Sequence, residues 1–194
     1  MNDTMHEMRE YVKKAFQQSG SHGFDHVIRV TSLCEVIGAR EHADLNILIP
    51  AALFHDIARQ LEVVDGTPHE IAGAEIAEHY LKSIQYDEEL IKGVIHAIQC
   101  HRFRTEKKPV TQEAKILSDA DKLDAMGAVG IARTFLQAGE RGGSITDGAG
   151  HIEEKLLKLH DLLYTDSARE MAIQRHGLLE VFFDNLNDEI NNPR

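Results

Sequence analysis

Four polar residues of types that bind metal ions fall within apolar helical patterns: His26, His55, Asp56 and Asp121. In the stretch AALFHDIAR, His55 and Asp56 stand together at the end of an apolar run. Burying two ionisable side chains without partners would cost several kcal/mol. The pair therefore predicts either ordinary partners, such as Arg59 three residues after Asp56, or a bound ion.

Two imidazoles and two carboxylates form a ligand set that suits a borderline or hard divalent cation with open positions for water. We expect Mn²⁺ first, with Mg²⁺, Co²⁺, Fe²⁺ or Ni²⁺ as alternatives. The absence of cysteine from the set argues against a structural zinc site. For any one of these residues an ordinary role would suffice, such as a surface pair between Asp121 and Lys122. The four together predict a metal centre.

The elements that must position these residues are helices, because the apolar periodicity is helical nearly everywhere and no stretch alternates like a strand. The sequence therefore predicts an all-α fold. We expect helices over residues 5–18, from about 25, and over 45–60, 68–83, 88–100, 112–125, 127–138, 151–163 and 167–190.

Local signals set several of the expected helix ends. Asp44 and Asp87 are predicted N-caps, and Thr67 before a proline predicts a capped helix with His69 in its first turn. Pro50 predicts a late start or a kink in its helix. The glycine-rich residues 139–150 are expected to be irregular, either as a mobile flap or as a long connection.

Composition limits the classes of protein. The 194 residues are 42% hydrophobic, which predicts a single ordered domain over residues 1–194. The formal net charge of −11 makes duplex nucleic acid an unexpected partner. The first residues contain no apolar signal region, and no run is long enough to span a membrane. We expect a cytoplasmic protein that does not bind membranes.

Four segments resemble the HD superfamily of metal-dependent phosphohydrolases, in particular a bacterial branch of stand-alone HD proteins. They are HGFDHVIRV, AALFHDIA, HEIAGAEIA and DADKLDAMGA, which begin at residues 22, 51, 69 and 119. The resemblance covers most of residues 20–183 and implies one HD-domain helical bundle with a divalent metal site in its core. The metal ligands that it implies are His26, His55, Asp56 and Asp121.

The resemblance also implies roles for residues around these ligands. A bound metal ion would lower the pKa of a water molecule and polarise a phosphoryl oxygen. His69 and His101 stand where relatives with two metals carry extra histidines, so they would bind a second ion or contact phosphate. The candidate catalytic residues are Asp56, His101 and Lys122. The candidate substrate-binding residues are Arg29, His69, Lys122, Arg102 and Arg133.

Several substrates stay open within this superfamily. Some HD nucleotidases carry a glutamate three residues after the HD aspartate, where this chain has Arg59. That departure counts against a 5′-nucleotidase and favours a (deoxy)nucleoside triphosphate pyrophosphohydrolase. The sequence also allows a phosphodiesterase of cyclic nucleotides or dinucleotides, or a non-catalytic nucleotide-binding protein. The expected partner is a small phosphorylated molecule, and both a monomer and a homodimer stay open.

Overall fold

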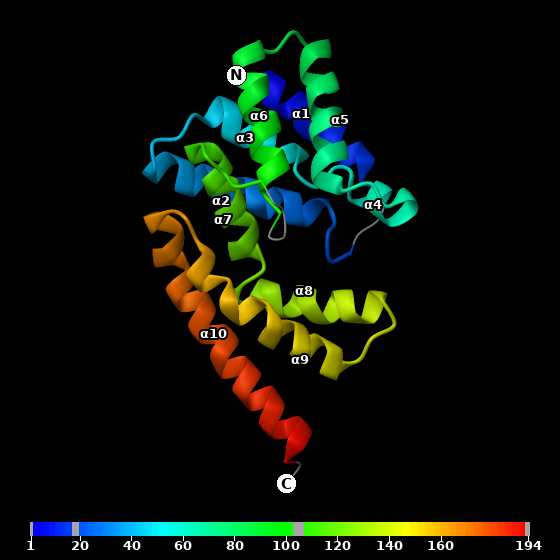
Figure 1. Ribbon diagram of the computed structural model, residues 1–194, viewed down its shortest axis with the longest axis vertical. Coiled ribbons are helices and arrows are strands. Elements are labelled where there is room, and N and C mark those ends of the chain that lie inside the picture. Colours follow the sequence, from blue (N-terminus) through cyan, green and yellow to red (C-terminus); the bar gives the residue numbers. More distant parts are fainter. Residues whose placement is uncertain (1, 17–19, 103–106, 193–194) are drawn as a thin grey trace. The chain divides into compact units, whose positions relative to one another are not determined.

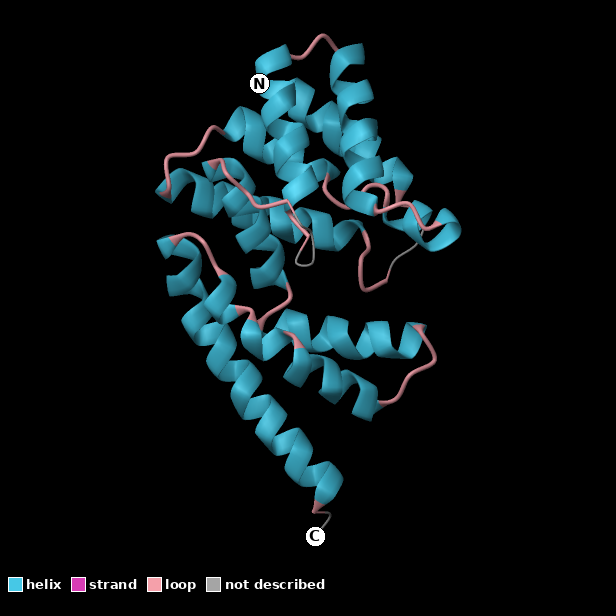
Figure 2. Ribbon diagram, in the orientation of Figure 1, coloured by secondary structure: helices cyan, strands magenta, loops and turns pink. Residues whose placement is uncertain are grey.

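The computed structural model describes residues 2–16, 20–102 and 107–192, and every regular element in these ranges is helical (Figure 1; Figure 2). The predicted all-α class is therefore confirmed. The chain divides into two compact units, Met1–Asp121 and Lys122–Arg194, with the boundary inside one helix. The expectation of one domain stays a prediction.

The first unit is built around a central helix. This helix, α3 (Leu45–Phe54), packs against α1, α2, α5 and α6. Its residues 50–54 are buried, as expected for a helix that is apolar on nearly all sides. Helices α5 and α6 lie side by side (Figure 1). The other helices of this unit are α1 (Asn2–Ala15), α2 (Phe24–Arg40), α4 (Arg59–Asp65), α5 (His69–Ser83), α6 (Glu88–Cys100) and α7 (Gln112–Asp124), which runs past the boundary.

Helix α3 includes Pro50 and still begins where its cap predicts. The Asp44 carboxylate accepts a hydrogen bond from the Asn46 backbone N–H at 2.8 Å, which confirms the predicted N-cap. A late start because of Pro50 was wrong. Proline has no N–H for the carbonyl four residues earlier, which is that of Asn46. The Tyr86 hydroxyl donates to this carbonyl instead, at 2.8 Å.

The chain leaves the helical path directly after Phe54, so the expected helix to residue 60 was wrong. The Ile57 N–H donates to the Phe54 carbonyl at 3.1 Å, and the Arg59 N–H donates to the Asp56 carbonyl at 3.0 Å. These bonds join residues three apart and replace the four-residue spacing of an α-helix. A separate short helix, α4, follows and ends at Gly66, whose φ of 79° is left-handed.

Two other predicted helix starts and one helix end have definite outcomes. Asp87 caps α6 by accepting hydrogen bonds from two backbone N–H groups, as predicted. Thr67 was the wrong N-cap, because α5 has Pro68 at this position without a side-chain cap bond. Helix α1 ends at Ala15, and residues 17 and 18 of its predicted extent lie outside the described residues.

The second unit packs its shorter helices against the long helix α10 (Asp166–Asn191), which confirms the helix expected over about 167–190. The irregular stretch expected over residues 139–150 is limited to residues 141–144, a short turn between two helices, so the prediction was wrong for the rest of the segment. Helix α9 (Ile145–Glu154) begins there with a capping box between Ser144 and Asp147. The expected helix over 151–163 was also wrong. The remaining elements are α8 (Gly127–Glu140) and two 3₁₀ turns, Leu156–Lys158 and His160–Leu162.

One glycine of the expected loop has a packing role. A Cβ atom on Gly148 would lie 2.6 Å from a ring carbon of Phe135 on α8. Only a residue without a side chain lets α8 and α9 approach this closely. The glycine content that predicted an irregular segment therefore serves helix packing at this position.

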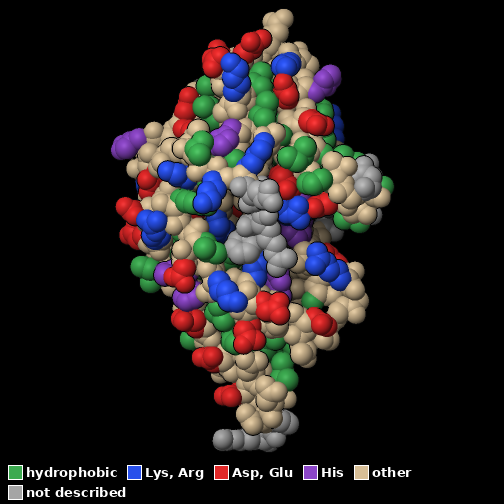
Figure 3. Space-filling model, in the orientation of Figure 1, with side chains coloured by type: hydrophobic (Ala, Val, Ile, Leu, Met, Phe, Trp, Pro, Cys, Tyr) green, Lys and Arg blue, Asp and Glu red, His purple; other side chains and the backbone are tan. Residues whose placement is uncertain are grey.

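The surface carries charges of both signs. Figure 3 shows acidic and basic side chains interspersed over the face that it presents. None of the described helices combines the length and the apolar character that a membrane span requires.

Candidate metal centre

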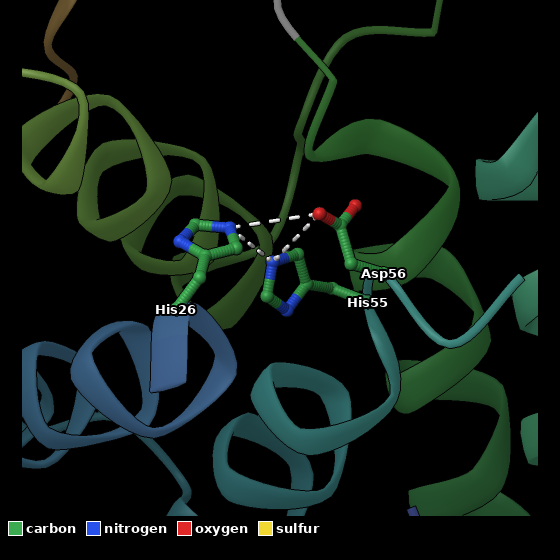
Figure 4. A group of neighbouring side chains, drawn as sticks. All are labelled: His26, His55 and Asp56. Atoms are coloured by element: carbon green, nitrogen blue, oxygen red, sulfur yellow. Dashed lines mark hydrogen bonds and ion pairs between the residues drawn. The ribbon is translucent and has the colours of Figure 1, made fainter. Parts of the chain in front are cut away.

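A buried cluster of imidazoles and carboxylates forms in the first unit, where the ends of several helices meet. Figure 4 shows three members, which come from α2 and from the turn that follows α3. The side chains of His26, His55 and Asp56 are 0%, 0% and 1% exposed. Among the described residues, the cluster also includes the buried His69 and His101, and Asp121, whose side chain is 26% exposed.

Asp56 lies between two groups of histidines. Its Oδ2 atom is 3.6 Å from Nε2 of His26 and 3.9 Å from Nε2 of His55. The same two imidazole nitrogens are 3.3 Å apart, and Nε2 of His26 is 3.4 Å from Oδ1 of Asp121. All four residues implied as metal ligands by the sequence are therefore in one place.

The other carboxylate oxygen faces the two remaining histidines. Oδ1 of Asp56 is 3.3 Å from Nε2 of His69 and 3.7 Å from Nε2 of His101. Among the described residues, neither this oxygen nor Nε2 of His69 has a hydrogen-bond partner, although both are buried. Buried polar atoms are rarely left in this state without an ion or a water molecule.

Backbone carbonyls fix the orientation of two of the histidines. Nδ1 of His55 donates to the Ala52 carbonyl at 2.7 Å, and Nδ1 of His101 donates to the Ile98 carbonyl at 2.6 Å. A carbonyl oxygen can only accept, so each Nδ1 carries the proton of the neutral ring. Each Nε2 then presents a lone pair to the cluster.

The charges of the cluster follow from its burial and from its contacts. Burial opposes ionisation of Asp56, but Arg59 and the neighbouring imidazoles hold its pKa well below the usual range. Burial lowers the pKa of His55 to about 4, against the attraction of Asp56. Burial also opposes ionisation of Asp121, but its side-chain hydrogen bond with His26 holds its pKa well below the usual value. The cluster thus combines ionised carboxylates with a neutral imidazole at His55.

The pair between Asp56 and Arg59 that the sequence left open as an ordinary role is present. Nε of Arg59 lies 3.3 Å from Oδ2 of Asp56. This contact occupies one oxygen only, and Oδ1 stays without a hydrogen bond in the described chain. The ion pair therefore accompanies the cluster and does not account for it.

Sequence reasoning missed a group of charged residues behind His69. Nδ1 of His69 lies 2.6 Å from Oε2 of Glu62 and 3.5 Å from Oε2 of Glu70. Arg102 pairs with both carboxylates, at 2.8 Å from Glu62 and 3.2 Å from Glu70. Glu70 could have been suspected because it adjoins His69, whereas nothing in the local sequence pointed to Glu62.

The cations predicted to bind substrate lie in different surroundings. Arg29 pairs with Asp25 at 2.5 Å, and Arg102 belongs to the group behind His69. Lys122 and Arg133 belong to the second unit. Nζ of Lys122 lies 4.9 Å from the ring centre of Tyr164, and Arg133 pairs with Asp124 at 2.7 Å. Their roles toward a substrate stay predictions.

The cluster fits a divalent metal ion. Its donor atoms form sets of three that lie within 4.8 Å of one another, one with His26, His55 and Asp56 and another with Asp56, His69 and His101. A cation would satisfy the lone pairs of Oδ1 of Asp56 and Nε2 of His69, which otherwise face each other. Imidazole and carboxylate ligands suit Mn²⁺ and neighbouring divalent ions.

Comparison with known proteins agrees with this geometry. Residues 23–126 match the model of the HD domain family. YpgQ of Bacillus subtilis is 37% identical over 183 residues, which cover 89% of this chain and 86% of YpgQ. The chain belongs to the HD domain family. HD domains bind divalent metals, and the cluster around Asp56 supplies suitable donors.

Solved structures give the same assignment. The crystal structure of Bacillus subtilis YpgQ in complex with ADP matches 97% of this chain and 98% of its own, with a TM-score of 0.80 and 34% identity. An HD-superfamily hydrolase from Bacillus thuringiensis matches 98% of both chains, with a TM-score of 0.78 and 30% identity. The resemblance to HD-superfamily hydrolases that the sequence motifs indicated is confirmed.

Proposed function

We propose that this chain is a metal-dependent phosphohydrolase that converts (deoxy)nucleoside triphosphates to monophosphates and pyrophosphate. The observation that carries the proposal is the buried contact between Oδ1 of Asp56 and Nε2 of His69. The two atoms are 3.3 Å apart and have no hydrogen-bond partner among the described residues. In an HD-family chain, such facing lone pairs are best explained by a bound cation.

The proposed metal ligands are His26, His55, Asp56 and Asp121. When bound, the ion would make a water molecule a better nucleophile and would polarise a phosphoryl oxygen. His69 and His101 offer donors on the other side of Asp56, so the cluster has ligands for one ion or for two. The chain's contribution is to hold Asp56 ionised through Arg59 and to aim the lone pairs of His55 and His101 inward.

The proposed hydrolysis joins the oxygen of water to the α-phosphorus. It breaks the bond between this phosphorus and the oxygen that bridges to the β-phosphate, and pyrophosphate leaves. We assign His101 to accept the proton that water loses, because its Nδ1 proton is held by the Ile98 carbonyl and its Nε2 is a lone pair. Asp56 and Lys122 are the other proposed catalytic residues, the first as an anion and the second as a cation.

Two observations support a nucleotide as the substrate. YpgQ, similar to this chain over nearly its whole length, has been crystallised with ADP. The position three residues after Asp56 holds Arg59 where some HD nucleotidases carry glutamate, which favours the triphosphate over the monophosphate. The proposed phosphate-binding side chains are Arg29, His69, Lys122, Arg102 and Arg133. A phosphate group would have to compete with Asp25 for Arg29 and with Glu62 and Glu70 for Arg102.

Phosphorus NMR tests the proposal directly. A panel of ribo- and deoxyribonucleotides is incubated with Mn²⁺ and either the wild-type chain or His55→Ala, whose fold is checked by circular dichroism. Pyrophosphate released from triphosphates by the wild type alone is the expected result. Orthophosphate from monophosphates would indicate a 5′-nucleotidase, and cleavage of cyclic nucleotides or dinucleotides alone would indicate a phosphodiesterase. Nucleotide binding without any product would indicate a non-catalytic protein.

We further propose that manganese is the physiological metal and that the protein is cytoplasmic. Either a monomer or a homodimer is compatible with the proposal. Activity with Mn²⁺, Mg²⁺, Co²⁺, Fe²⁺ and Ni²⁺ in turn ranks the metals. Metal analysis of the purified chain gives the number of ions per molecule. Light scattering during size-exclusion chromatography gives the mass of the particle in solution.

A further inference from the structure

The histidines around Asp56 receive their orientation in two different ways. His55 and His101 each follow the last residue of a helix, α3 and α6. The final carbonyls of a helix have no partner within it, so a ring nitrogen can donate to them. The carbonyls of Ala52 and Ile98, each three residues earlier, accept from these two rings.

His69 cannot use this device. It is the first residue of α5, and the first turn of a helix presents N–H groups where the last turn presents carbonyls. Its Nδ1 atom meets a side chain, the Glu62 carboxylate, at 2.6 Å. A carboxylate only accepts, so the proton of the neutral ring lies on Nδ1 and the lone pair of Nε2 faces Asp56.

We propose that Glu62 is a positioning residue that fixes the tautomer of His69, so that Nε2 of His69 offers a lone pair to the metal centre. Without this acceptor the proton could move to Nε2, which lies 3.3 Å from Oδ1 of Asp56. A protonated Nε2 has no lone pair to offer a cation. The Glu62 carboxylate therefore keeps Nε2 of His69 available for the metal centre.

The local fold is arranged to bring Glu62 to His69. The break after Phe54 starts α4, and Gly66 ends it with a left-handed φ of 79°. This turn sends the chain back so that α4 packs against α5. Two residues seven apart in sequence thereby meet side chain to side chain, which a continuous helix would not allow.

Arg102 holds the carboxylate in this orientation. Its NH1 atom lies 2.8 Å from Oε1 of Glu62, which leaves Oε2 for His69. A carboxylate can serve both donors at once because it has an acceptor on each oxygen, whereas a glutamine has one oxygen for the two. Glu62→Gln should therefore disturb the tautomer of His69 although the side chain keeps its size.

Glu70→Gln is the matched control for this substitution. Oε2 of Glu70 lies farther from the same nitrogen, at 3.5 Å, and Arg102 also pairs with this carboxylate. Both variants remove a carboxylate charge that pairs with Arg102. An effect through Arg102 or through charge alone would therefore appear in both.

The test uses the full chain without metal and with ¹⁵N-labelled histidine. Long-range proton–nitrogen correlation spectra at neutral pH report which ring nitrogen carries the proton, and the loss of a signal in His69→Asn assigns His69. We expect a proton on Nδ1 in the wild type and in Glu70→Gln, and a mixture or a proton on Nε2 in Glu62→Gln. A His69 spectrum unchanged in Glu62→Gln, or changed equally in Glu70→Gln, would overturn the proposal.

A second readout connects the tautomer to metal binding and rests on the proposed function. Loss of a carboxylate behind a ligating histidine weakens metal binding by about 10- to 100-fold. We expect such a loss of Mn²⁺ affinity for Glu62→Gln and no change for Glu70→Gln, and equal affinities would refute this consequence. The tautomer is measured without metal or substrate, so it is decided separately from whether the chain hydrolyses nucleotides.

Discussion

The burial of His55 makes the stability of the metal-free chain depend on pH. Burial lowers the pKa of this imidazole from 6.5 to about 4 in the folded chain. Between these values the unfolded chain binds a proton that the folded chain does not, so stability falls as the pH falls. The full shift in the pKa of His55 corresponds to about 3 kcal/mol in the free energy of unfolding. Most of this, about 2 kcal/mol, is lost between pH 7.5 and pH 5.

Urea unfolding followed by circular dichroism measures this loss in the presence of a chelator. His55→Asn is the control, because an asparagine amide can still donate to the Ala52 carbonyl but does not titrate. The free energy of unfolding of the wild type should fall by about 2 kcal/mol more than that of the variant over this pH range. Parallel pH profiles would refute the argument, because they would mean that His55 is not neutral and buried in the folded chain.

Two other predictions concern the packing of the fold. Gly148→Ala should destabilise the chain by about 1–3 kcal/mol, because the new methyl group would meet the ring of Phe135. Gly150→Ala on the same helix is the control: its methyl group meets nothing within 4 Å, and it should raise the melting temperature. Equal melting temperatures would count against the close approach. Tyr86→Phe should cost about 1 kcal/mol in urea unfolding, because the Asn46 carbonyl loses its donor; a variant as stable as the wild type would show that water replaces the hydroxyl.

The helical class and the N-caps of α3 and α6 could be predicted from the sequence, but the positions at which helices break could not. Asp44 and Asp87 are short acceptors placed directly before apolar runs, and both cap a helix. The break after Phe54 was hidden because the apolar pattern continues through Ile57 and Leu61. The pattern shows which residues are apolar, but it does not show whether the backbone hydrogen bonds span three residues or four, and Leu61 is in fact 43% exposed.

The glycine-rich segment misled for a different reason. A high glycine content favours a loop. Ser144 followed three residues later by Asp147 is a helix-start signal, and in this segment it is decisive. One of these glycines, Gly148, allows α9 to pack closely against Phe135 of α8. The local composition therefore pointed away from the tertiary requirement.

The residues of the candidate site were predicted unevenly. The cluster of imidazoles and carboxylates could be predicted because the family motifs mark those positions one by one. Glu62 could not, since it belongs to no motif and reaches His69 only through the turn at Gly66. Contacts of this kind depend on how the turn between two helices packs one against the other. The spacing of residues in a single sequence does not reveal that packing.

Manganese binding by the wild type and by Asp56→Asn tests whether the buried cluster around Asp56 is a metal centre. Titration calorimetry or the electron paramagnetic resonance of free Mn²⁺ gives the affinity and the number of ions. Asp44→Asn makes the same chemical change at the other end of α3, where asparagine also serves as an N-cap. We expect at least one tightly bound ion in the wild type and in Asp44→Asn, and binding weaker by more than about 100-fold in Asp56→Asn. Equal binding by a correctly folded Asp56→Asn would contradict it.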